Sequence, residues 1–337
     1  MLTNLSFSEG RFLDVFKSGQ VTLLLKKAWA DDKNMANFWP IINMNTIEKI
    51  LERLAQNQMR LHIQGSPNFS QLQSSYRTLH STKMAMTIVV NNLLAATDNK
   101  TSSVLLSLDI SAAFDTLDHH RLIESAKNLF ELDEIVLEWL QSYLTGCTQY
   151  MSVGDCCSIT VIMTSGVLQG LVPGLLLFST LTAPVETLIN SFGINYYQFA
   201  NDTLYTIIDH DSSHCLESLT ACADAVTGWH IWNILLLNPS KTEALVAGTR
   251  QQVAKLDTSN GIAVSGSIAP FSSKLRVLHV TMDEKLTFKD NIFRIVRACN
   301  YHLRTLRHIR LLVDQEIAHT FACLLVCTRL DYCNAIL

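Results

Sequence analysis

The chain has 337 residues, of which 48% are hydrophobic and 17% are charged, and this composition excludes a chain that is disordered throughout. Its length allows a large buried core and one to three substructures. The formal net charge of −4 argues against a general attraction to nucleic acid, which requires clustered Lys and Arg. Local basic patches must therefore carry any such binding.

Two basic patches are visible in the sequence. One is Lys26-Lys27, and the other is a row of arginines at near-helical spacing: Arg294, Arg297, Arg304, Arg307 and Arg310. The row predicts either a nucleic-acid-binding helix face or an ordinary solvated face.

The cysteines and the longest uncharged run both bear on the cellular location. The nine cysteines lack paired zinc spacing, and no secretory signal follows Met1, so we expect reduced thiols in an intracellular protein of the cytoplasm or nucleus that is not secreted. No charged residue lies between Asp155 and Glu186. Because prolines and glycines interrupt this run, it predicts a buried strand and helix and no membrane span.

The first predicted elements are a strand within Leu13 to Lys27 and two helices. Asn45 and Glu48 have the spacing of a capping pair, and apolar residues then recur at helical intervals: Ile47, Ile50, Leu51 and Leu54. The pattern predicts an amphipathic helix that buries this stripe. Thr82 to Ala96 predicts the second helix.

The segment Val104 to Asp115 contains an apolar run that ends at Asp109. Such a run predicts a buried strand that delivers a carboxylate to its exposed end. A strand-end turn residue is the alternative for Asp109. Further along, apolar residues predict a short helix: Ile135, Leu137, Leu140 and Leu144.

A glycine-rich stretch, Ser165 to Gly174, leads into an apolar helix-like run. Its glycines would let the backbone approach a ligand closely. The following stretch, Tyr196 to Ile207, has two aromatic and β-branched runs around Asn201 and Asp202. It predicts a β-hairpin with this polar pair at the tip of its turn.

The C-terminal part predicts helices and one strand. Leu216, Leu219, Ala223 and Val226 form an apolar stripe that Gly228 would end. Leu275 to Val280 has a strand pattern, and helices are expected from Asp290 to Leu312 and from Gln315 onward.

Three of these segments together resemble the reverse transcriptase domain of LINE-class, non-LTR retrotransposons. Leu108 to His119 is similar to the first catalytic motif, Gly166 to Phe178 to the nucleotide-binding motif, and Phe199 to Thr203 to the aromatic-Ala-Asp-Asp motif. Other segments agree, so the resemblance covers nearly the whole chain: Gln73 to Arg77, Leu237 to Glu243 and Thr328 to Ala335.

The resemblance implies an α+β, right-hand polymerase fold with fingers, an α/β palm that contains an antiparallel catalytic hairpin, and a helical thumb. We expect residues 1–100 to form the fingers, 101–250 the palm with interleaved fingers elements, and 251–337 the palm end and a thumb-like region. The implied activity is RNA-directed DNA polymerisation, with an RNA template, a DNA primer and deoxynucleotides as partners. Neither a membrane nor a defined protein partner is expected.

The resemblance also implies roles for individual residues. Two Mg²⁺ ions would be held by Asp109, Asp202 and the Ile110 carbonyl, and Asn201 and Lys241 would complete the catalytic set. The nucleotide-binding residues would be Ile110, Phe114, Gln169, Gly170 and Arg77. For some of these residues an ordinary structural role is the alternative: Phe114 as a core aromatic residue, Gln169 as a turn residue, and Lys241 and Arg77 as solvated surface.

Asn201 stands where the family has a metal-binding Asp. An amide oxygen can bind Mg²⁺, but it brings no negative charge, and the loss corresponds to roughly two to four orders of magnitude in rate. The nucleotide-binding motif departs from the family at further positions: Leu168, Leu171, Pro173 and Leu175. We therefore interpret the chain as a degenerate copy with weak or lost activity. Two alternatives to an active polymerase remain, an inactive nucleic-acid-binding module and a fossil open reading frame with no selected function.

Overall fold

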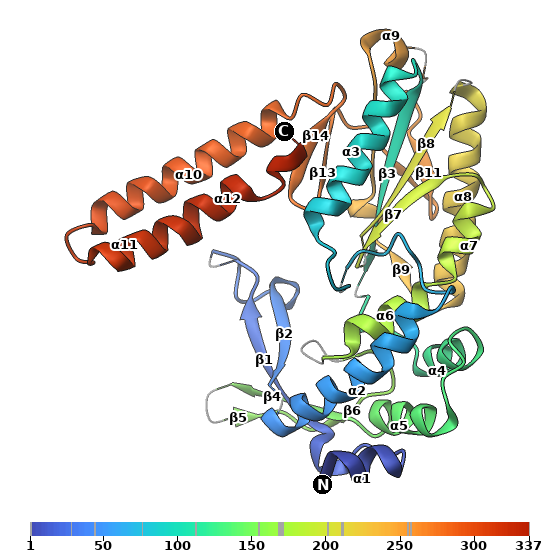
Figure 1. Ribbon diagram of the computed structural model, residues 1–337, viewed down its shortest axis with the longest axis vertical. Coiled ribbons are helices and arrows are strands. Elements are labelled where there is room, and N and C mark those ends of the chain that lie inside the picture. The colour runs from blue at the N-terminus through green and yellow to red at the C-terminus, as the bar shows by residue number, and fades with distance from the viewer. Residues whose placement is uncertain are drawn as a thin grey trace. The chain divides into compact units, whose positions relative to one another are not determined.

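The computed structural model describes every residue except 1, 28, 44, 76, 112, 154, 155, 168–171, 201, 210, 211, 255, 257 and 337. The chain forms two compact units. The first unit contains Met1–Gln71, Ile110–Leu188 and Thr227–Leu237, and the second contains Leu72–Asp109, Ile189–Val226 and Asn238–Leu337. Both units contain helices and strands (Figure 1), so the predicted α+β class is confirmed.

The first unit contains a mixed sheet with the strand order β2-β1-β4-β5, and β6 also pairs with β4. Strand β1 (Ser18–Leu25) pairs antiparallel with β2 (Phe38–Asn43) and parallel with β4 (Thr148–Val153). The short strands β5 (Cys156–Cys157) and β6 (Val161–Ile162) are exposed, so the buried strand predicted for the uncharged run is wrong.

The first unit also contains most of the helices of the N-terminal half. These are α1 (Leu2–Ser8), α2 (Thr46–Gly65), α4 (His119–Asn128), α5 (Glu134–Leu144) and α6 (Gly174–Thr182), and α7 (Val185–Asn190) leads into the second unit. Helix α6 is buried along nearly its whole length, as expected for the second half of the uncharged run. None of the described helices is both long and apolar enough to cross a membrane.

Helix α2 begins as predicted but buries a different face. Asn45 caps it by accepting a hydrogen bond from the Ile47 backbone N–H at 3.0 Å. Ile47, Ile50 and Leu54 are exposed, whereas the buried residues are Glu48, Leu51, Glu52, Ala55, Met59 and Ile63. The predicted stripe is therefore wrong except at Leu51, and the reason is that two glutamates point inward, which an apolar pattern cannot reveal.

The second unit contains an antiparallel sheet with the strand order β10-β3-β8-β7. Its strands are β7 (Asn195–Phe199), β8 (Asp202–Asp209), β10 (Glu243–Ala247) and β3 (Ser102–Ser111), whose last two residues pair with β9 (Leu236–Leu237) in the first unit. The predicted strand around Asp109 and the predicted hairpin are both confirmed. Helix α3 (Thr82–Asp98) covers one face of the sheet (Figure 1), because its apolar residues form a common core with Leu105, Tyr197 and Leu245.

Helix α8 (Ser212–Trp232) has the predicted apolar stripe, with Leu219, Ala223 and Val226 buried. It does not end at Gly228 but continues to Trp232. A single glycine inside a helix costs only about 1 kcal/mol relative to alanine, which the packing of the helix can offset. The prediction that Gly228 ends the helix is therefore wrong.

The C-terminal part of the second unit contains two β-hairpins and a helical hairpin. The strands are β11 (Ile262–Val264) with β12 (Ser267–Ala269), and β13 (Lys274–Val277) with β14 (Val280–Asp283), which replace the single strand predicted from Leu275 to Val280. A short helix, α9 (Arg250–Val253), precedes them.

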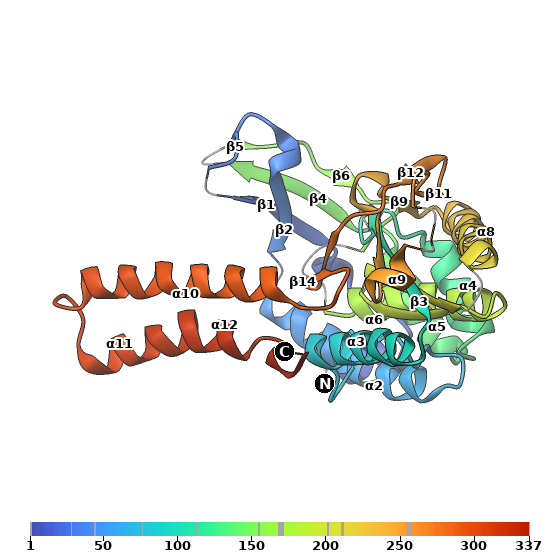
Figure 2. The ribbon, with the colours of Figure 1, turned by 90° about the horizontal axis from the view of Figure 1, so that it is seen from above.

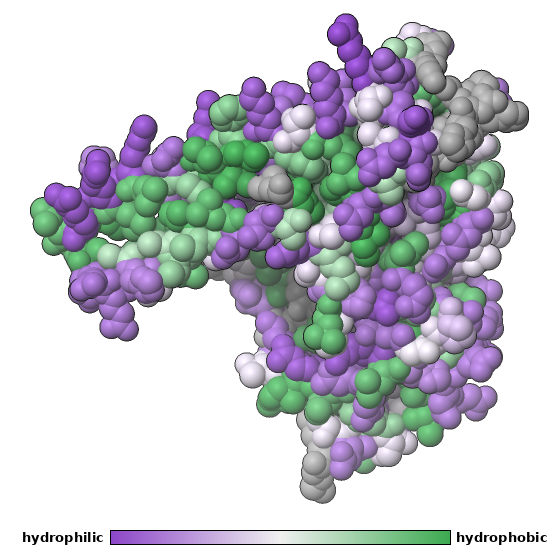
Figure 3. All heavy atoms as spheres, turned by 45° about the horizontal axis from the view of Figure 1, so that its top comes forward, coloured by the Kyte–Doolittle hydropathy of each residue, from purple (hydrophilic) through white to green (hydrophobic). Residues whose placement is uncertain are grey.

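The predicted C-terminal helices are confirmed. Helix α10 (Lys289–Ile309) runs beside a second helical segment, which consists of α11 (Gln315–Ala322), a π-helical turn at Cys323–Cys327 and α12 (Thr328–Asp331). Figure 2 shows the two segments as an antiparallel pair, and Figure 3 shows hydrophobic side chains along this pair with hydrophilic side chains at its edges.

Candidate active site

The site is built on the pairing of two neighbouring strands. In the register of β3 and β8, Asp109 lies directly opposite Asp202. Directly opposed residues of antiparallel strands have Cβ atoms about 4.5–5.5 Å apart, so the two carboxyl groups are neighbours. Asp109 is buried and Asp202 is half-buried. Two acidic side chains are thus held side by side by the backbone of the sheet.

The hairpin turn that precedes Asp202 is held by polar side chains of an upstream segment. Ala200 has a φ of +57°, which is unfavourable for a residue with a Cβ. Its backbone N–H donates to Gln73 Oε1 at 3.1 Å and to Ser75 Oγ at 2.8 Å, and its carbonyl accepts from Gln73 Nε2 at 3.2 Å. These bonds offset the cost of the turn.

The register also corrects the predicted position of the turn. Phe199 pairs with Asp202, so Asp202 is the first residue of β8 and does not lie at the tip. Asn201, the other predicted tip residue, lies outside the described residues. A strand position gives Asp202 a fixed orientation relative to Asp109.

Lys241 reaches the carboxylate pair from a 3₁₀ turn, Pro239–Lys241, that follows Asn238. The Asn238 backbone N–H donates to the Asp109 carbonyl oxygen at 2.8 Å, which fixes the turn beside the strand. Lys241 Nζ then forms an ion pair with Asp109 Oδ2 at 2.8 Å. The lysine side chain is 66% exposed and the aspartate side chain only 10%, so a solvated ammonium group meets a nearly buried carboxylate.

The pair of carboxylates changes the acidity of Asp202. Burial and the neighbouring Asp109 carboxylate together raise the pKa of Asp202 to about 6, and the ammonium group of Lys241 acts in the opposite direction. The single ammonium group of Lys241 offsets only one of the two carboxylate charges, so the ionised pair still attracts a cation.

A cavity of about 280 Å³ opens beside the two carboxylates, and its polar lining also includes Ser107, Glu243 and Arg276. Sequence reasoning missed Glu243 and Arg276. Glu243 lies opposite Ser107 in the register of β10 and β3, two residues before Asp109 in the strand and hence on the same face of the sheet. The spacing of two residues between Lys241 and Glu243 could have indicated that both side chains lie on the same side of the chain as the carboxylate pair. Among the described residues, no group of three His, Cys, Asp or Glu side chains is arranged to hold a metal ion.

Arg77 belongs to the second unit and is partly exposed. Its guanidinium group lies close enough to Tyr197 for its positive charge to affect the pKa of the Tyr197 hydroxyl. Burial raises the pKa of Tyr197, and the hydrogen bond with Ser74 and the charge of Arg77 oppose this shift. Arg77 therefore lies beside the hairpin strand β7, which contains Tyr197.

The first unit contains the remaining predicted nucleotide-binding residues that the structure describes. Phe114 is half-buried and packs against Phe178, with the ring centroids 5.4 Å apart. Ile110 is buried in β3 and pairs with Leu237. Gln169 and Gly170 lie outside the described residues.

Gly166 is close to another part of the first unit and not to an open site. Its φ is +83°, and a Cβ at this position would lie 2.5 Å from the Asp115 carbonyl oxygen. The Gly166 N–H donates to the Leu117 carbonyl at 2.7 Å, and the Val167 N–H donates to the Phe114 carbonyl at 2.7 Å. The sequence predicted that the glycines of this stretch let the backbone approach a ligand. At Gly166 the backbone instead approaches the loop that contains Asp115.

A family model described as reverse transcriptase (RNA-dependent DNA polymerase) matches residues 26–285, which is most of the chain. The chain belongs to the reverse transcriptase family. The resemblance inferred from its motifs is thereby confirmed, and reverse transcriptases in general use divalent metal ions.

Curated relatives of this reverse transcriptase domain come from Drosophila retrotransposons. A probable RNA-directed DNA polymerase from transposon BS of Drosophila melanogaster is 27% identical over 298 residues, which cover 85% of this chain and 32% of the relative. The polymerase from mobile element jockey of the same species is 25% identical over 304 residues, which cover 88% of this chain and 32% of the relative. The domain thus spans about a third of the length of these relatives and is a reverse transcriptase domain of the retrotransposon type.

Solved structures with a similar fold include telomerases. Apo telomerase from Candida tropicalis, truncated from its C-terminal domain, has a TM-score of 0.54 at 14% identity, with 82% of this chain and 55% of the telomerase covered. Telomerase from Candida albicans has a TM-score of 0.54 at 12% identity, with 83% and 46% covered. Both have the right-hand polymerase fold, so the predicted fold of this domain is confirmed.

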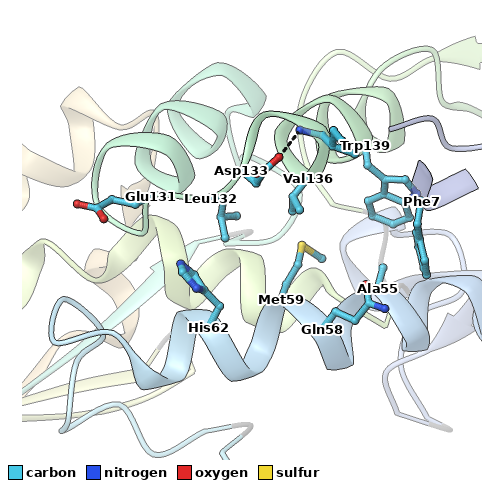
Figure 4. Close-up of a pocket in the computed structure, with 11 residues that line it drawn as sticks. Phe7, Ala55, Gln58, Met59, His62, Glu131, Leu132, Asp133, Val136 and Trp139 are labelled. Atoms are coloured by element: carbon cyan, nitrogen blue, oxygen red, sulfur yellow. Dashed lines mark hydrogen bonds between the residues drawn. The ribbon is translucent and has the colours of Figure 1, made fainter. Parts of the chain in front are cut away.

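A separate cavity of about 350 Å³ in the first unit lies among α1, α2 and α5 (Figure 4). His62 Nε2 donates to the Phe130 carbonyl at 2.6 Å, and Asp133 Oδ1 accepts from the Ile135 N–H at 3.0 Å and caps α5. Figure 4 shows the Glu131 carboxylate pointing away from the cavity. These polar groups serve the fold of the reverse transcriptase domain, and the lining is otherwise largely apolar: Phe7, Met59, Val136 and Trp139.

Proposed function

We propose that this reverse transcriptase domain descends from an enzyme for RNA-directed DNA polymerisation and that its own polymerase activity is weak or lost. The observation that supports descent most directly is the strand register that sets Asp109 opposite Asp202 beside a cavity. Such a carboxylate pair is what a nucleotidyl transfer assisted by two metal ions requires. The division into fingers, palm and thumb at residues 100 and 250 is part of the same proposal.

The donor set fits a hard divalent cation. Carboxylate and carbonyl oxygens are the ligands that Mg²⁺ prefers, and Asp109, Asp202 and the Ile110 carbonyl are the proposed ligands. When bound, Mg²⁺ activates an attacking hydroxyl oxygen and stabilises the leaving pyrophosphate. Lys241 holds a proton 2.8 Å from Asp109 Oδ2 and is the proposed proton donor to the leaving group.

The proposed nucleotide-binding residues act through contact and shape. Arg77 would bind phosphate, and Phe114 would lie under the sugar and exclude a ribose 2′-hydroxyl. Gln169 and Gly170 would bind the nucleotide. The packing of Phe114 against Phe178 is compatible with both this role and the alternative, a core aromatic residue.

The proposed loss of activity rests on the sequence at Asn201. The amide brings no negative charge to a site that already contains the ammonium group of Lys241. Two positive metal ions would therefore meet two carboxylates where the family has three. The expected cost is roughly two to four orders of magnitude in rate.

Primer extension tests the proposal. The natural chain and Asn201→Asp are compared on a poly-rA template with an oligo-dT primer, first with Mg²⁺ and then with Mn²⁺. Little or no synthesis by the natural chain and clear synthesis by Asn201→Asp would support descent and locate the defect at one ligand. Full polymerase activity of the natural chain would contradict the proposed loss of activity. If neither chain synthesises DNA, the loss of activity has causes beyond the substitution at Asn201.

A second candidate function, nucleic-acid binding without synthesis, is favoured by one surface of α10. Arg294, Arg297 and Arg304 line a groove of about 780 Å³ together with Phe293 and Tyr301. Guanidinium groups bind phosphates, and aromatic rings stack with bases. The RNA template and DNA primer are the proposed partners for this groove.

Salt-dependent RNA binding separates the second candidate from a fossil reading frame without function. A binding module would hold single-stranded RNA at physiological salt and lose affinity as salt rises. A chain that folds, shows neither binding nor synthesis, and gains neither with Asn201→Asp would favour the fossil reading frame.

A further inference from the structure

A cavity at the base of the helical hairpin in the second unit combines three arginines with no carboxylate in its lining. It has a volume of about 480 Å³ and lies between the β13–β14 turn, α10 and α12. We call it the base cavity, and its polar lining consists of Arg276, His279, Asn291, Arg294, Thr328, Arg329 and Tyr332. The lining contains no acidic side chain that would neutralise the arginines.

Neutral groups hold two of the three cationic side chains in place. Arg294 Nη2 donates to Asn291 Oδ1 at 2.9 Å and to the His279 carbonyl oxygen. Arg276 Nη2 donates to His279 Nδ1 at 3.1 Å. Neither arginine, nor Arg329, forms an ion pair with a carboxylate of the described residues. The guanidinium groups of Arg276 and Arg294 are therefore oriented by the fold, and none of the three is neutralised by a carboxylate of the described residues.

One of the guanidinium groups is also incompletely hydrogen-bonded. Arg294 Nε is buried and has no partner among the described residues. A buried N–H group without a partner costs about 1–3 kcal/mol, so it is rare unless a ligand supplies the acceptor. Burial lowers the pKa of Arg294, and the charges of Arg276 and Arg329 lower it further, which is the repulsion that an anion would relieve.

We propose that the base cavity binds a phosphate group that carries more than one negative charge, as in a terminal phosphate or a diphosphate. A guanidinium group can donate two parallel N–H···O hydrogen bonds to two oxygens of one phosphate group. A phosphodiester has a single charge, whereas a terminal phosphate carries about −1.5 to −2 at pH 7 and neutralises more of the three arginines.

This inference does not depend on polymerase activity, because Asp109 and Asp202 do not line the base cavity. Arg276 lines both this cavity and the one beside the carboxylates. The same phosphate chemistry has two sources, a free diphosphate and the 5′-phosphate end of an RNA, and the two arms of the experiment distinguish them.

The first arm is calorimetric titration of the full chain with pyrophosphate at low ionic strength without divalent cations. The natural chain is expected to bind one equivalent, and Arg294→Gln or Arg329→Gln is expected to raise the Kd by about tenfold or more. Arg329 is exposed, so Arg329→Gln retains the fold even if Arg294→Gln does not, and circular dichroism checks both.

Two control variants locate the site. Arg307→Gln removes an exposed arginine of α10 outside the base cavity, and Lys241→Gln removes the ammonium group beside Asp109. Arg307→Gln is expected to leave the Kd for pyrophosphate unchanged. Lys241→Gln tests the competing site beside the carboxylates, where Lys241 is the proposed proton donor to the leaving pyrophosphate. Loss of binding in Lys241→Gln with retention in Arg329→Gln would move the site to the carboxylate cavity and overturn the proposal.

The second arm compares two RNAs of the same sequence, one with a 5′-phosphate and one with a 5′-hydroxyl. About tenfold tighter binding of the phosphorylated RNA, lost in Arg329→Gln, would identify the RNA end as the source. Pyrophosphate binding that depends on Arg329, without any preference between the RNAs, would identify a free diphosphate. If neither ligand responds to Arg329→Gln or to Arg294→Gln, the base cavity is not a phosphate site.

Discussion

Two carboxylates that face each other across neighbouring strands repel, and the fold keeps Asp109 and Asp202 together despite this repulsion. The exposed ammonium group of Lys241 offsets only part of it, because solvent screens its charge. Polar groups placed for chemistry in this way commonly reduce stability. The residues of the site are therefore expected to lower the free energy of unfolding when no cation is present.

Asp202→Asn should raise the free energy of unfolding in metal-free buffer by about 1 kcal/mol, because it removes one of the two like charges without changing the shape of the side chain. Chemical denaturation with a chelator present measures the change. Added Mg²⁺ should raise the melting temperature of the natural chain more than that of the variant. A variant that is less stable than the natural chain under chelation would contradict the repulsion.

A second pair of acidic residues, Glu48 and Glu52, is buried in the first unit. The Tyr143 hydroxyl donates a hydrogen bond to Glu52 Oε1 at 2.6 Å, and the Val172 N–H donates one to Glu52 Oε2 at 3.1 Å. Burial and the charge of Glu52 raise the pKa of Glu48 to about 7, while the neighbouring Lys49 lowers it. Burial likewise raises the pKa of Glu52.

This raised acidity predicts how stability depends on pH. The folded chain binds the Glu48 proton more tightly than the unfolded chain does, so the free energy of unfolding should fall as pH rises from about 4.5 to 7 and stay low above pH 7. Glu48→Gln should remove about 1–2 kcal/mol of this fall and stabilise the chain at pH 8. Urea denaturation at pH 5, 6, 7 and 8 measures it, with the exposed Glu9→Gln as the control. Equal pH profiles for the natural chain and Glu48→Gln would refute the prediction.

At the scale of the element, local patterns predicted where helices and strands form better than which faces they bury. The cap at Asn45 and the spacing of apolar residues predicted α2, but its inward face contains Glu48 and Glu52. That choice depends on Tyr143, which lies 91 residues further along the chain than Glu52. A contact of this separation leaves no signal in a local window.

Glycines also illustrate the difference between local and tertiary control. Gly228 lies inside α8, where an added Cβ would meet no atom within 4 Å, whereas at Gly166 the φ of +83° and the Asp115 carbonyl both exclude a side chain. Gly228→Ala should stabilise the chain by about 0.5–1 kcal/mol, and Gly166→Ala should destabilise it by about 2–4 kcal/mol. Thermal and urea denaturation of this matched pair checks both signs. Similar effects at the two positions would contradict the assigned backbone conformations.

At the scale of the whole molecule, the family motifs predicted the fold and the carboxylate pair, since Asp109 and Asp202 lie in segments that the register of β3 and β8 joins. They did not predict the base cavity. Its arginines come from β13, α10 and α12, and only their packing brings Arg276, Arg294 and Arg329 together. The arginine row seen in the sequence is likewise divided, because Arg294 lines both the base cavity and the groove on α10, while Arg297 and Arg304 line only the groove.

A chain with a net charge of −4 repels nucleic acid at long range, so binding must depend on a few local arginines. If Arg297 and Arg304 each neutralise one phosphate, replacing both with Gln should reduce the slope of log K against log salt for single-stranded RNA by about 1.4. Fluorescence anisotropy from 50 to 200 mM salt gives this slope, with Lys100→Gln combined with Arg250→Gln as a charge-matched control. An unchanged slope in the α10 variant would exclude the groove as the binding surface. A reduced slope with the control unchanged would assign the phosphate contacts to α10, because both variants lose the same net charge and differ only in where it is lost.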